Sequence, residues 1–156
     1  MEVFEKSMKV MKELFERDYQ FALATVNNNI PSVRFIDTYY DDGCFYIVTY
    51  ATSKKVKEIE MNKNVSLCNK SYSFNGEAFN LGHPLKPNNS GIREKLIHAF
   101  EPWYFKHNNE SDENMCYVKV ELKNGFFYKD GVGYKVDFLV QQASEFPFEF
   151  DIVLTE

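Results

Sequence analysis

The chain has 156 residues and a formal net charge of −5, with 44% hydrophobic and 17% aromatic residues. This length suits one domain over residues 1–156 with a sizeable core, and the acidic balance argues against a nucleic-acid partner. No apolar run is long enough to span a membrane, and the first residues do not resemble a signal peptide. We therefore expect no membrane partner and a cytoplasmic location.

The N-terminal segment, residues 3–17, is predicted to be an amphipathic helix. Phe4, Met8, Met11 and Phe15 recur at spacings of four, three and four residues, which places them on one helix face. Charged residues fill the opposite face. We expect the helix to pack on the rest of the domain through its apolar face.

Three strands are predicted next, because short runs rich in β-branched and aromatic residues alternate with turn residues. They cover residues 19–26, 32–40 and 44–50. The turns between them are expected at Asn27-Asn28-Asn29 and at Asp41-Asp42-Gly43.

A short helix over residues 54–61 should follow the third strand, and its start is the most informative part of the chain. Thr52 and Ser53 are favourable N-cap residues, and Lys54 and Lys55 follow in the first turn. A helix N-terminus already carries unpaired N–H groups and a partial positive charge, so added lysines favour a bound anion. A phosphate group would fit this site, and the alternative is a capped surface helix with solvated lysines.

The second half of the chain is predicted to be mostly strands. They are expected over residues 65–69, 73–81, 115–122 and 132–138, with hairpin turns at Asn124-Gly125 and Asp130-Gly131. One further helix should carry Ile92, Leu96, Ile97 and Phe100 on a single stripe. The tail from residue 139 has no regular pattern, but its apolar residues, which include Phe146, Phe148 and Phe150, should pack on something.

These elements predict a mainly β (α+β) fold, a barrel of six or seven strands with two or three flanking helices. Regular βαβ alternation is missing, and so are the glycine-rich loops of the common nucleotide-binding folds. Cys44, Cys68 and Cys116 are too far apart for a zinc pattern, and we expect them to be buried structural thiols. The three histidines pair with no second ligand at metal-binding spacing, so no metal site is expected.

The order of these features resembles a known family. Residues 19–80 run through an Asn-rich turn, a Pro31-x-x-Arg34 strand, an Asp-Asp-Gly turn, an aromatic strand, the Ser53-Lys54-Lys55 helix start and an Asn64-Val65-Ser66 strand. This order is similar to that of the pyridoxamine 5′-phosphate oxidase-like family of FMN-binding split β-barrels. The resemblance implies a split β-barrel, with FMN as the cofactor.

The resemblance also implies which residues would contact FMN. The arginine-led strand would bind the pyrimidine edge and form a wall for the flavin ring, the end of the next strand would line the ribityl chain, and the helix start would bind the phosphate. Lysine replaces the more common arginine in the phosphate motif, which keeps the charge but loses the bidentate geometry. In chain order, the implied cofactor-binding residues are Arg34, Phe35, Ile36, Asp37, Val48, Thr49, Ser53, Lys54 and Lys55.

Members of this family hold the flavin between two subunits, so a homodimer is implied. The family's vitamin B6 oxidases hold their substrate with C-terminal Trp and Arg residues, and residues 126–156 contain neither. We therefore expect an FMN-dependent oxidoreductase acting on another small molecule, and no true pyridoxamine 5′-phosphate oxidase activity. No catalytic residue is predicted, because the flavin carries the chemistry. The alternatives are a barrel that holds FMN, haem or another cofactor without turnover, and an interaction barrel with an empty site.

Overall fold

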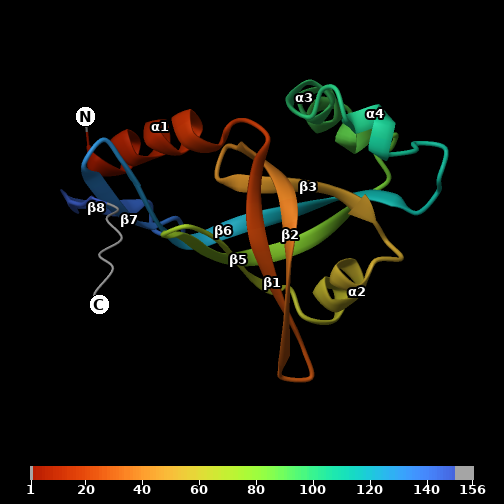
Figure 1. The fold of residues 1–156 in the computed structure, drawn as a ribbon, viewed down its shortest axis with the longest axis horizontal. Coiled ribbons are helices and arrows are strands. Elements are labelled where there is room, and N and C mark those ends of the chain that lie inside the picture. Colours follow the sequence, from red (N-terminus) through yellow and green to blue (C-terminus); the bar gives the residue numbers. More distant parts are fainter. Residues whose placement is uncertain (1, 150–156) are drawn as a thin grey trace, which may run out of the picture.

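A computed structural model describes residues 2–149 and shows a mainly β protein with helices around a sheet (Figure 1). The strands are β1 (Tyr19–Asn27), β2 (Ile30–Asp41), β3 (Cys44–Tyr50), β4 (Asn64–Asn69), β5 (Tyr72–Gly82), β6 (Met115–Lys129), β7 (Val132–Asp137) and β8 (Gln142–Pro147). The helices are α1 (Val3–Phe15), α2 (Lys54–Met61), the 3₁₀ turn η1 (Pro87–Asn89), α3 (Ser90–Ala99) and α4 (Tyr104–His107). None of these helices is long and apolar enough to cross a membrane.

Six of the strands form a closed antiparallel barrel. The sheet order is β3-β2-β1-β4-β5-β6, and pairing of β3 with β6 closes it. The second half of β6 leaves the barrel and pairs with β7, which pairs with β8. The predicted fold class, a six- to seven-stranded split β-barrel with flanking helices, is therefore confirmed, with β7 and β8 as an extension of the sheet.

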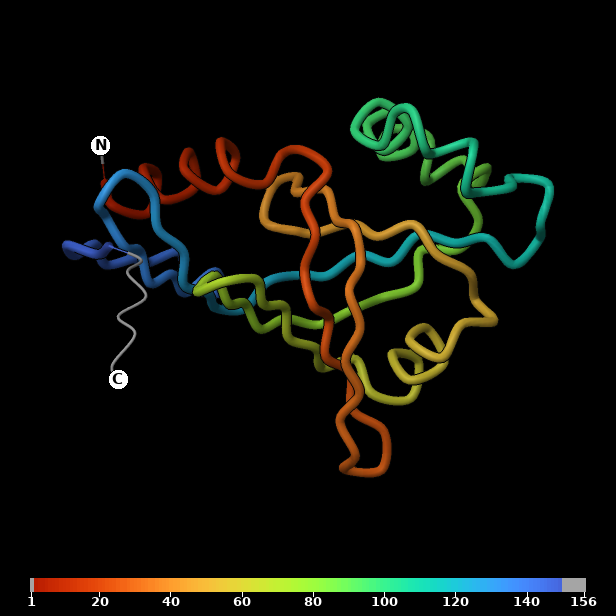
Figure 2. Tube along the Cα trace, in the orientation of Figure 1, coloured from red at the N-terminus to blue at the C-terminus, as the bar shows by residue number. Residues whose placement is uncertain are grey.

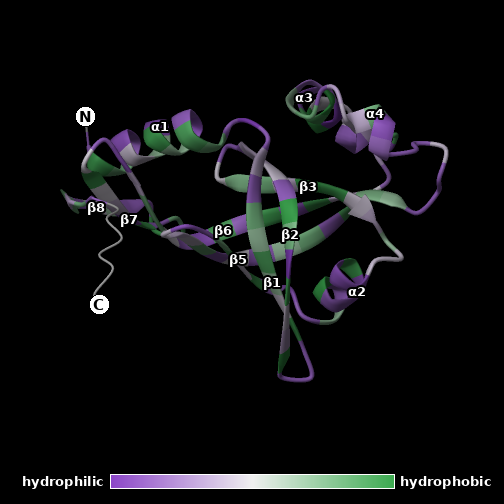
Figure 3. Cartoon of the chain, viewed as in Figure 1, coloured by the Kyte–Doolittle hydropathy of each residue, from purple (hydrophilic) through white to green (hydrophobic). Residues whose placement is uncertain are grey.

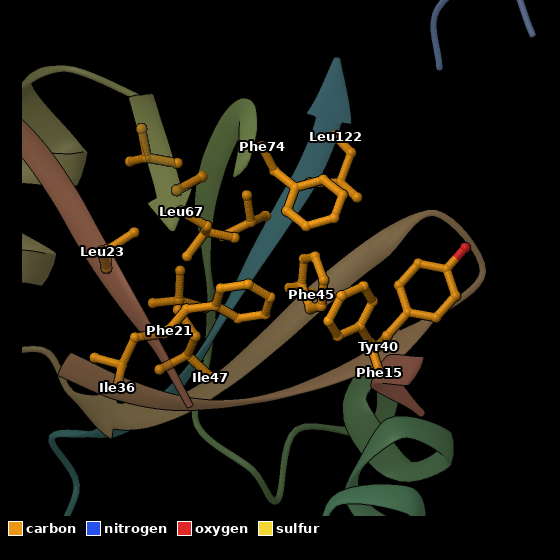
Figure 4. Close-up of a cluster of buried hydrophobic side chains, with 14 of the residues drawn as sticks. Phe15, Phe21, Leu23, Ile36, Tyr40, Phe45, Ile47, Leu67, Phe74 and Leu122 are labelled. Atoms are coloured by element: carbon orange, nitrogen blue, oxygen red, sulfur yellow. The ribbon is translucent and has the colours of Figure 1, made fainter. Parts of the chain in front are cut away.

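Side-chain alternation along the strands builds the barrel core. Phe21 and Leu23 on β1 point inward, as do Phe45 and Ile47 on β3 (Figure 4). Phe15 at the end of α1 is fully buried, and its ring centroid lies within 5.7 Å of those of Phe21, Phe45 and Phe74. The predicted N-terminal helix thus packs on the barrel, although it ends at Phe15 and not at residue 17.

A second, smaller core lies between the outer face of the β3–β6 pair and helices α3 and α4. It is centred on the buried side chains of Leu96, Phe100, Tyr104, Met115 and Tyr117. A polar chain runs through it, in which Arg93 donates two hydrogen bonds to Glu110, at 2.8 and 2.6 Å, and Tyr104 donates one at 2.9 Å. This core fixes α3 and α4 on the barrel.

The β1–β2 hairpin extends beyond the barrel, and α2 lies beside its base (Figure 2). The two strands pair from Tyr19 with Thr38 to Asn27 with Ile30. Asn28 and Asn29 take positive φ values of 52° and 62° at the tip, as the predicted turn requires. Hydrophilic and hydrophobic positions alternate along β1 and around α2 (Figure 3). The tip of the hairpin and α2 lie at the end of the barrel away from α1 (Figure 1).

Two expectations for the second half of the chain are wrong. Asn124-Gly125 is not a hairpin turn, because β6 continues through it and pairs with β5 on one side and β7 on the other. Only Asp130-Gly131 forms the turn, with both residues at positive φ.

The tail from residue 139 was expected to lack regular structure, but residues 142–147 form β8. Phe146 and Phe148 pack against Phe126, with ring centroids 5.9 and 5.0 Å away. This part of the tail therefore packs as expected, and Phe150 lies outside the described residues. Of the three cysteines, only Cys116 is buried, whereas Cys44 is partly exposed and Cys68 is exposed.

Candidate functional site

The N-terminus of α2 has the predicted local structure. Ser53 is the N-cap, with extended backbone angles, and its hydroxyl accepts a hydrogen bond from the Val56 N–H at 3.4 Å. The Thr49 hydroxyl, at the end of β3, lies 3.5 Å from that of Ser53. Val56 and Ile59 are buried and fix the inward face of the helix. The first turn of α2 therefore presents its N–H groups beside the end of β3.

Arg34 joins this site from β2. Its Nη1 donates to the Thr25 hydroxyl at 2.7 Å and to the Leu23 carbonyl at 3.2 Å. Its Nη2 lies 3.8 Å from a carboxylate oxygen of Glu58 on α2. The arginine is thus held on the inward face of β2, on the side that faces the helix.

Lys55 is partly buried next to Arg34. Burial lowers the pKa of Lys55, and the neighbouring positive charge of Arg34 lowers it further. Lys54 is different, because its side chain is 75% exposed and its Nζ lies 3.8 Å from Glu58. Lys55 and Arg34 repel one another beside the helix N-terminus, so a bound anion there would stabilise both.

The other predicted residues are spread over different faces of the barrel. Ile36 is in the core, and Thr49 points inward beside Cys116, its pairing partner on β6. Burial raises the pKa of that cysteine thiol to about 11. Val48 packs on the opposite side, against the α3–α4 core. The structure therefore brings together Arg34, Thr49, Ser53, Lys54 and Lys55, whereas Phe35, Asp37 and Val48 lie on outer faces.

Asp37 has an unexpected partner. Its carboxyl shares a hydrogen bond with that of Asp18, and the Trp103 indole donates a hydrogen bond to Asp18 Oδ2 at 2.7 Å. Burial, and next the negative charge of Asp18, raise the pKa of Asp37 to about 6. This carboxyl pair joins β2 to the segment after α1 and to the start of α4.

Two functional candidates were missed at the sequence level. Glu58 is 3% exposed, and Thr25, which is fully buried, donates to it at 3.2 Å. The sequence does contain one signal for Glu58, because it follows Lys54 by four residues and lies between the apolar positions Val56 and Ile59. No local pattern links it to Thr25, which is 33 residues away.

A pocket of about 430 Å³ lies beside α2. Its lining includes Lys54, Lys57 and Glu58 from the helix and Asn27 from the hairpin. A larger cavity of about 560 Å³ lies among β5, β6, β7 and β8, where Lys135 and Asp137 are the charged residues of the wall. The smaller pocket is the better candidate, because Thr52 and Lys54 at the helix start line it, although Arg34, Ser53 and Lys55 do not. Among the described residues, no three His, Cys, Asp or Glu side chains lie close enough to hold a metal ion.

The fold and this site define a small barrel with a capped helix start beside a group of cations. The sequence profile of the family described as pyridoxamine 5′-phosphate oxidase matches residues 7–113. The chain therefore belongs to the pyridoxamine 5′-phosphate oxidase-like family, a flavin-binding family of oxidoreductase type. No curated protein sequence matches it significantly.

Solved structures with the same fold include general stress protein 26 from Bacillus anthracis, with 22% identity over 81% of this chain and 93% of that one, at a TM-score of 0.60. An FAD-binding protein from Mesorhizobium loti is 17% identical over 76% and 89% of the two chains, at 0.57. A pyridoxamine 5′-phosphate oxidase-related, FMN-binding protein from Nostoc punctiforme is 11% identical over 96% and 98%, at 0.55. At these identities the likeness is one of fold.

Proposed function

We propose that this protein binds FMN through the N-terminus of α2 and acts as an FMN-dependent oxidoreductase on a small molecule. The observation that carries the proposal is the meeting of Arg34 and Lys55 at a capped helix start, where burial and the positive charge of Arg34 lower the pKa of Lys55. A terminal phosphate would relieve that repulsion and accept from the helix N–H groups.

The residues present fit the phosphate end of FMN. Arg34, Lys54 and Lys55 supply charge, and Ser53 and the first N–H groups of α2 supply short-range donors. The resemblance alone implies that Arg34 contacts the flavin ring. We assign it to the phosphate instead, because its guanidinium faces α2. When bound, FMN would supply the redox chemistry, and the protein groups would bind and orient it.

Two neighbours in fold support a flavin, since one is named as FMN-binding and another as FAD-binding. FMN is favoured for this chain because the cation cluster recognises a terminal phosphate monoester. The competing function is a barrel that holds FMN, haem or another cofactor without turnover. Reduction of the bound flavin by NADH or NADPH, followed by oxygen uptake, would separate an enzyme from such a carrier.

A homodimer is part of the proposal, with the second subunit covering the flavin. The outer face of the β1–β2 hairpin carries Val33 and Phe35, which are 69% and 68% exposed, and Ile30 at the start of β2, beside the tip, is 68% exposed. Met61 at the end of α2 is 80% exposed. Large apolar side chains gathered at the end of the barrel that holds the cation cluster suit burial by a second copy.

The test is the absorption spectrum of the purified protein, followed by titration with FMN and with riboflavin. We expect a flavin spectrum, or uptake of added FMN, with clear preference for FMN over riboflavin. Equal affinity for the two flavins would contradict a phosphate site at α2, and a haem spectrum would favour the competing function.

A further inference from the structure

Glu58 is a buried carboxylate at the centre of the cation cluster. Its Oε2 accepts a hydrogen bond from the Thr25 hydroxyl at 3.2 Å. Its Oε1 has no hydrogen-bond partner among residues 2–149. That same oxygen lies 3.8 Å from Arg34 Nη2 and 3.8 Å from Lys54 Nζ. The carboxylate therefore attracts two cations without closing a hydrogen bond to either.

A buried carboxylate oxygen without a donor is costly, so its position needs a reason. Orientation of Arg34 is not that reason, because Thr25 and the Leu23 carbonyl already hold Nη1. Lys54 is not fixed by Glu58 either, since its side chain is largely exposed. Glu58 instead supplies a negative charge between Arg34 and Lys54, whose positive charges would otherwise be uncompensated.

We infer that Glu58 is an internal anion that competes with the ligand's phosphate for Arg34 and Lys54 and thereby limits phosphate affinity. The inference rests on the proposed FMN site. With Glu58 ionised, Arg34, Lys54 and Lys55 leave a net charge of +2 in the cluster. A phosphate monoester near neutral pH carries about −1.5 to −2, so the site is matched to one such group.

The substitution Glu58→Gln removes the negative charge of the side chain and keeps its shape. Glutamine keeps the side-chain volume and still accepts from Thr25, but it releases Arg34 and Lys54 from the competing charge. We expect inorganic phosphate and FMN to bind about tenfold more tightly, because a like charge a few ångströms from the ligand is removed. Riboflavin, which has no phosphate, should bind as it does to the unchanged protein. The unloaded variant should melt at a lower temperature, because its cations then lack a counter-charge.

The experiment compares the unchanged protein, Glu58→Gln and the control Glu60→Gln in titrations with FMN, riboflavin and inorganic phosphate. Glu60 is on the same helix and its carboxylate accepts from Asn80 at 3.0 Å, so this control removes an equal charge outside the cluster. The expected result is a raised FMN-to-riboflavin affinity ratio and tighter inorganic phosphate binding in Glu58→Gln alone. An unchanged or lowered ratio, or phosphate binding no tighter than in the unchanged protein, would overturn the inference.

The outcomes distinguish this inference from the proposed function. If the unchanged protein binds FMN and riboflavin equally, the proposed function fails, and the inorganic phosphate titrations still decide the role of Glu58. If Glu58→Gln does not fold, a crystal structure of the unchanged protein with inorganic phosphate decides instead. Arg34 Nη2 and Lys54 Nζ should then lie closer to phosphate oxygens than to Glu58. A phosphate bound elsewhere, with both cations still on Glu58, would overturn the inference.

Discussion

Single residues at the start of α2 have different environments despite similar chemistry. Lys54 and Lys55 are neighbours, yet one is largely exposed and the other is half-buried beside Arg34. A partly buried charge is screened less by water and salt than an exposed one. Lys55 should therefore contribute more to anion binding than Lys54.

The substitution Lys55→Ala is expected to weaken FMN binding by about tenfold to a hundredfold, since a charge-assisted contact is worth roughly 1.5–3 kcal/mol. Lys54→Ala should weaken it less. Fluorescence titration with FMN and riboflavin checks this, because riboflavin affinity should not change. Lys63→Ala is the control, as this lysine follows α2 and pairs with Glu77 at 2.8 Å. Normal FMN binding by the double variant of Lys54 and Lys55 would place the phosphate elsewhere.

Asp37 leads to a prediction about pH. Its pKa is raised from 3.8 to about 6, so the folded state holds its proton more tightly than the unfolded state does. The associated stability is present at low pH and is lost as pH rises from about 4 through about 6. The loss should not exceed about 1 kcal/mol, because the carboxyl is partly exposed and water screens the pair.

Asp37→Asn should therefore be more stable than the unchanged protein at pH 7.5 and nearly equal to it at pH 4. Urea unfolding at both pH values measures this. Asp42→Asn is a suitable control, because Asp42 is an exposed turn residue. An identical pH dependence of stability in Asp37→Asn and the unchanged protein would show that the Asp18–Asp37 pair does not share a proton.

Rules that depend on neighbours in sequence predicted the local structure around the candidate site correctly. The cap at Ser53, the helix over residues 54–61 and the Asn28-Asn29 turn depend on neighbours in sequence, and all three are present. The pairing of Glu58 with Thr25 depends on the packing of α2 against β1, which no local pattern encodes. Asp37 could not be placed for the same reason, since its partner Asp18 comes from before β1.

Among the elements, β6 shows why a turn signal can fail. Asn-Gly is a strong hairpin signal, but here both residues lie within a strand of 15 residues that pairs on both sides. The glycine has a packing role instead, because a Cβ at Gly125 would collide with the ring of Phe74. Tertiary packing has overridden the local preference.

Gly125→Ala should therefore destabilise the protein by about 1–3 kcal/mol, the usual cost of overpacking a core. Gly91→Ala is the matched control, because a Cβ there meets nothing within 4 Å and Gly91 lies in helix α3. The control should be neutral or more stable by up to about 1 kcal/mol. Chemical denaturation of both variants measures the difference, and equal stabilities would show that Phe74 moves aside at little cost.

The sequence does not predict the edge strand β8, because its buried and exposed side chains do not alternate regularly. Only Ala143 and Phe146 are partly buried in Gln142–Pro147, and the rest is exposed. Its position is set by pairing with β7, from Val132 with Pro147 to Asp137 with Gln142. Barrel strands with a buried face were predictable, whereas a strand with most side chains in water was not.

For the whole molecule, the exposed apolar face of the β1–β2 hairpin predicts a dimer. Phe35→Lys should weaken dimerisation and, with it, flavin retention, because a charge would be buried in the interface. Sedimentation at micromolar concentration, together with flavin content, measures both. Leu85→Lys serves as the control, since Leu85 is also exposed but lies in the loop before η1. A monomer that holds stoichiometric FMN would contradict the prediction.

The C-terminal residues 126–156 contain no Arg and no Trp with which to hold a phosphorylated B6 vitamer. Residues 126–156 provide only Lys129 and Lys135 as bases, and Lys129 already pairs with Glu13 at 2.6 Å. Poor orientation of the substrate alone removes several kcal/mol of catalysis. FMN-loaded protein incubated with pyridoxamine 5′-phosphate in air should therefore form little pyridoxal 5′-phosphate. Turnover of about 1 per second or faster would show a true B6 oxidase.

The contact between α1 and β8 has a consequence for how the chain folds during synthesis. Lys6 pairs with Glu145 at 2.8 Å, a separation of 139 residues, and the barrel closes only when β6 pairs with β3. The helix is synthesised before the strands but has no complete surface to dock on until β6, β7 and β8 have left the ribosome. Its apolar face, which ends at Phe15, stays open to chaperones and to other nascent chains for that interval.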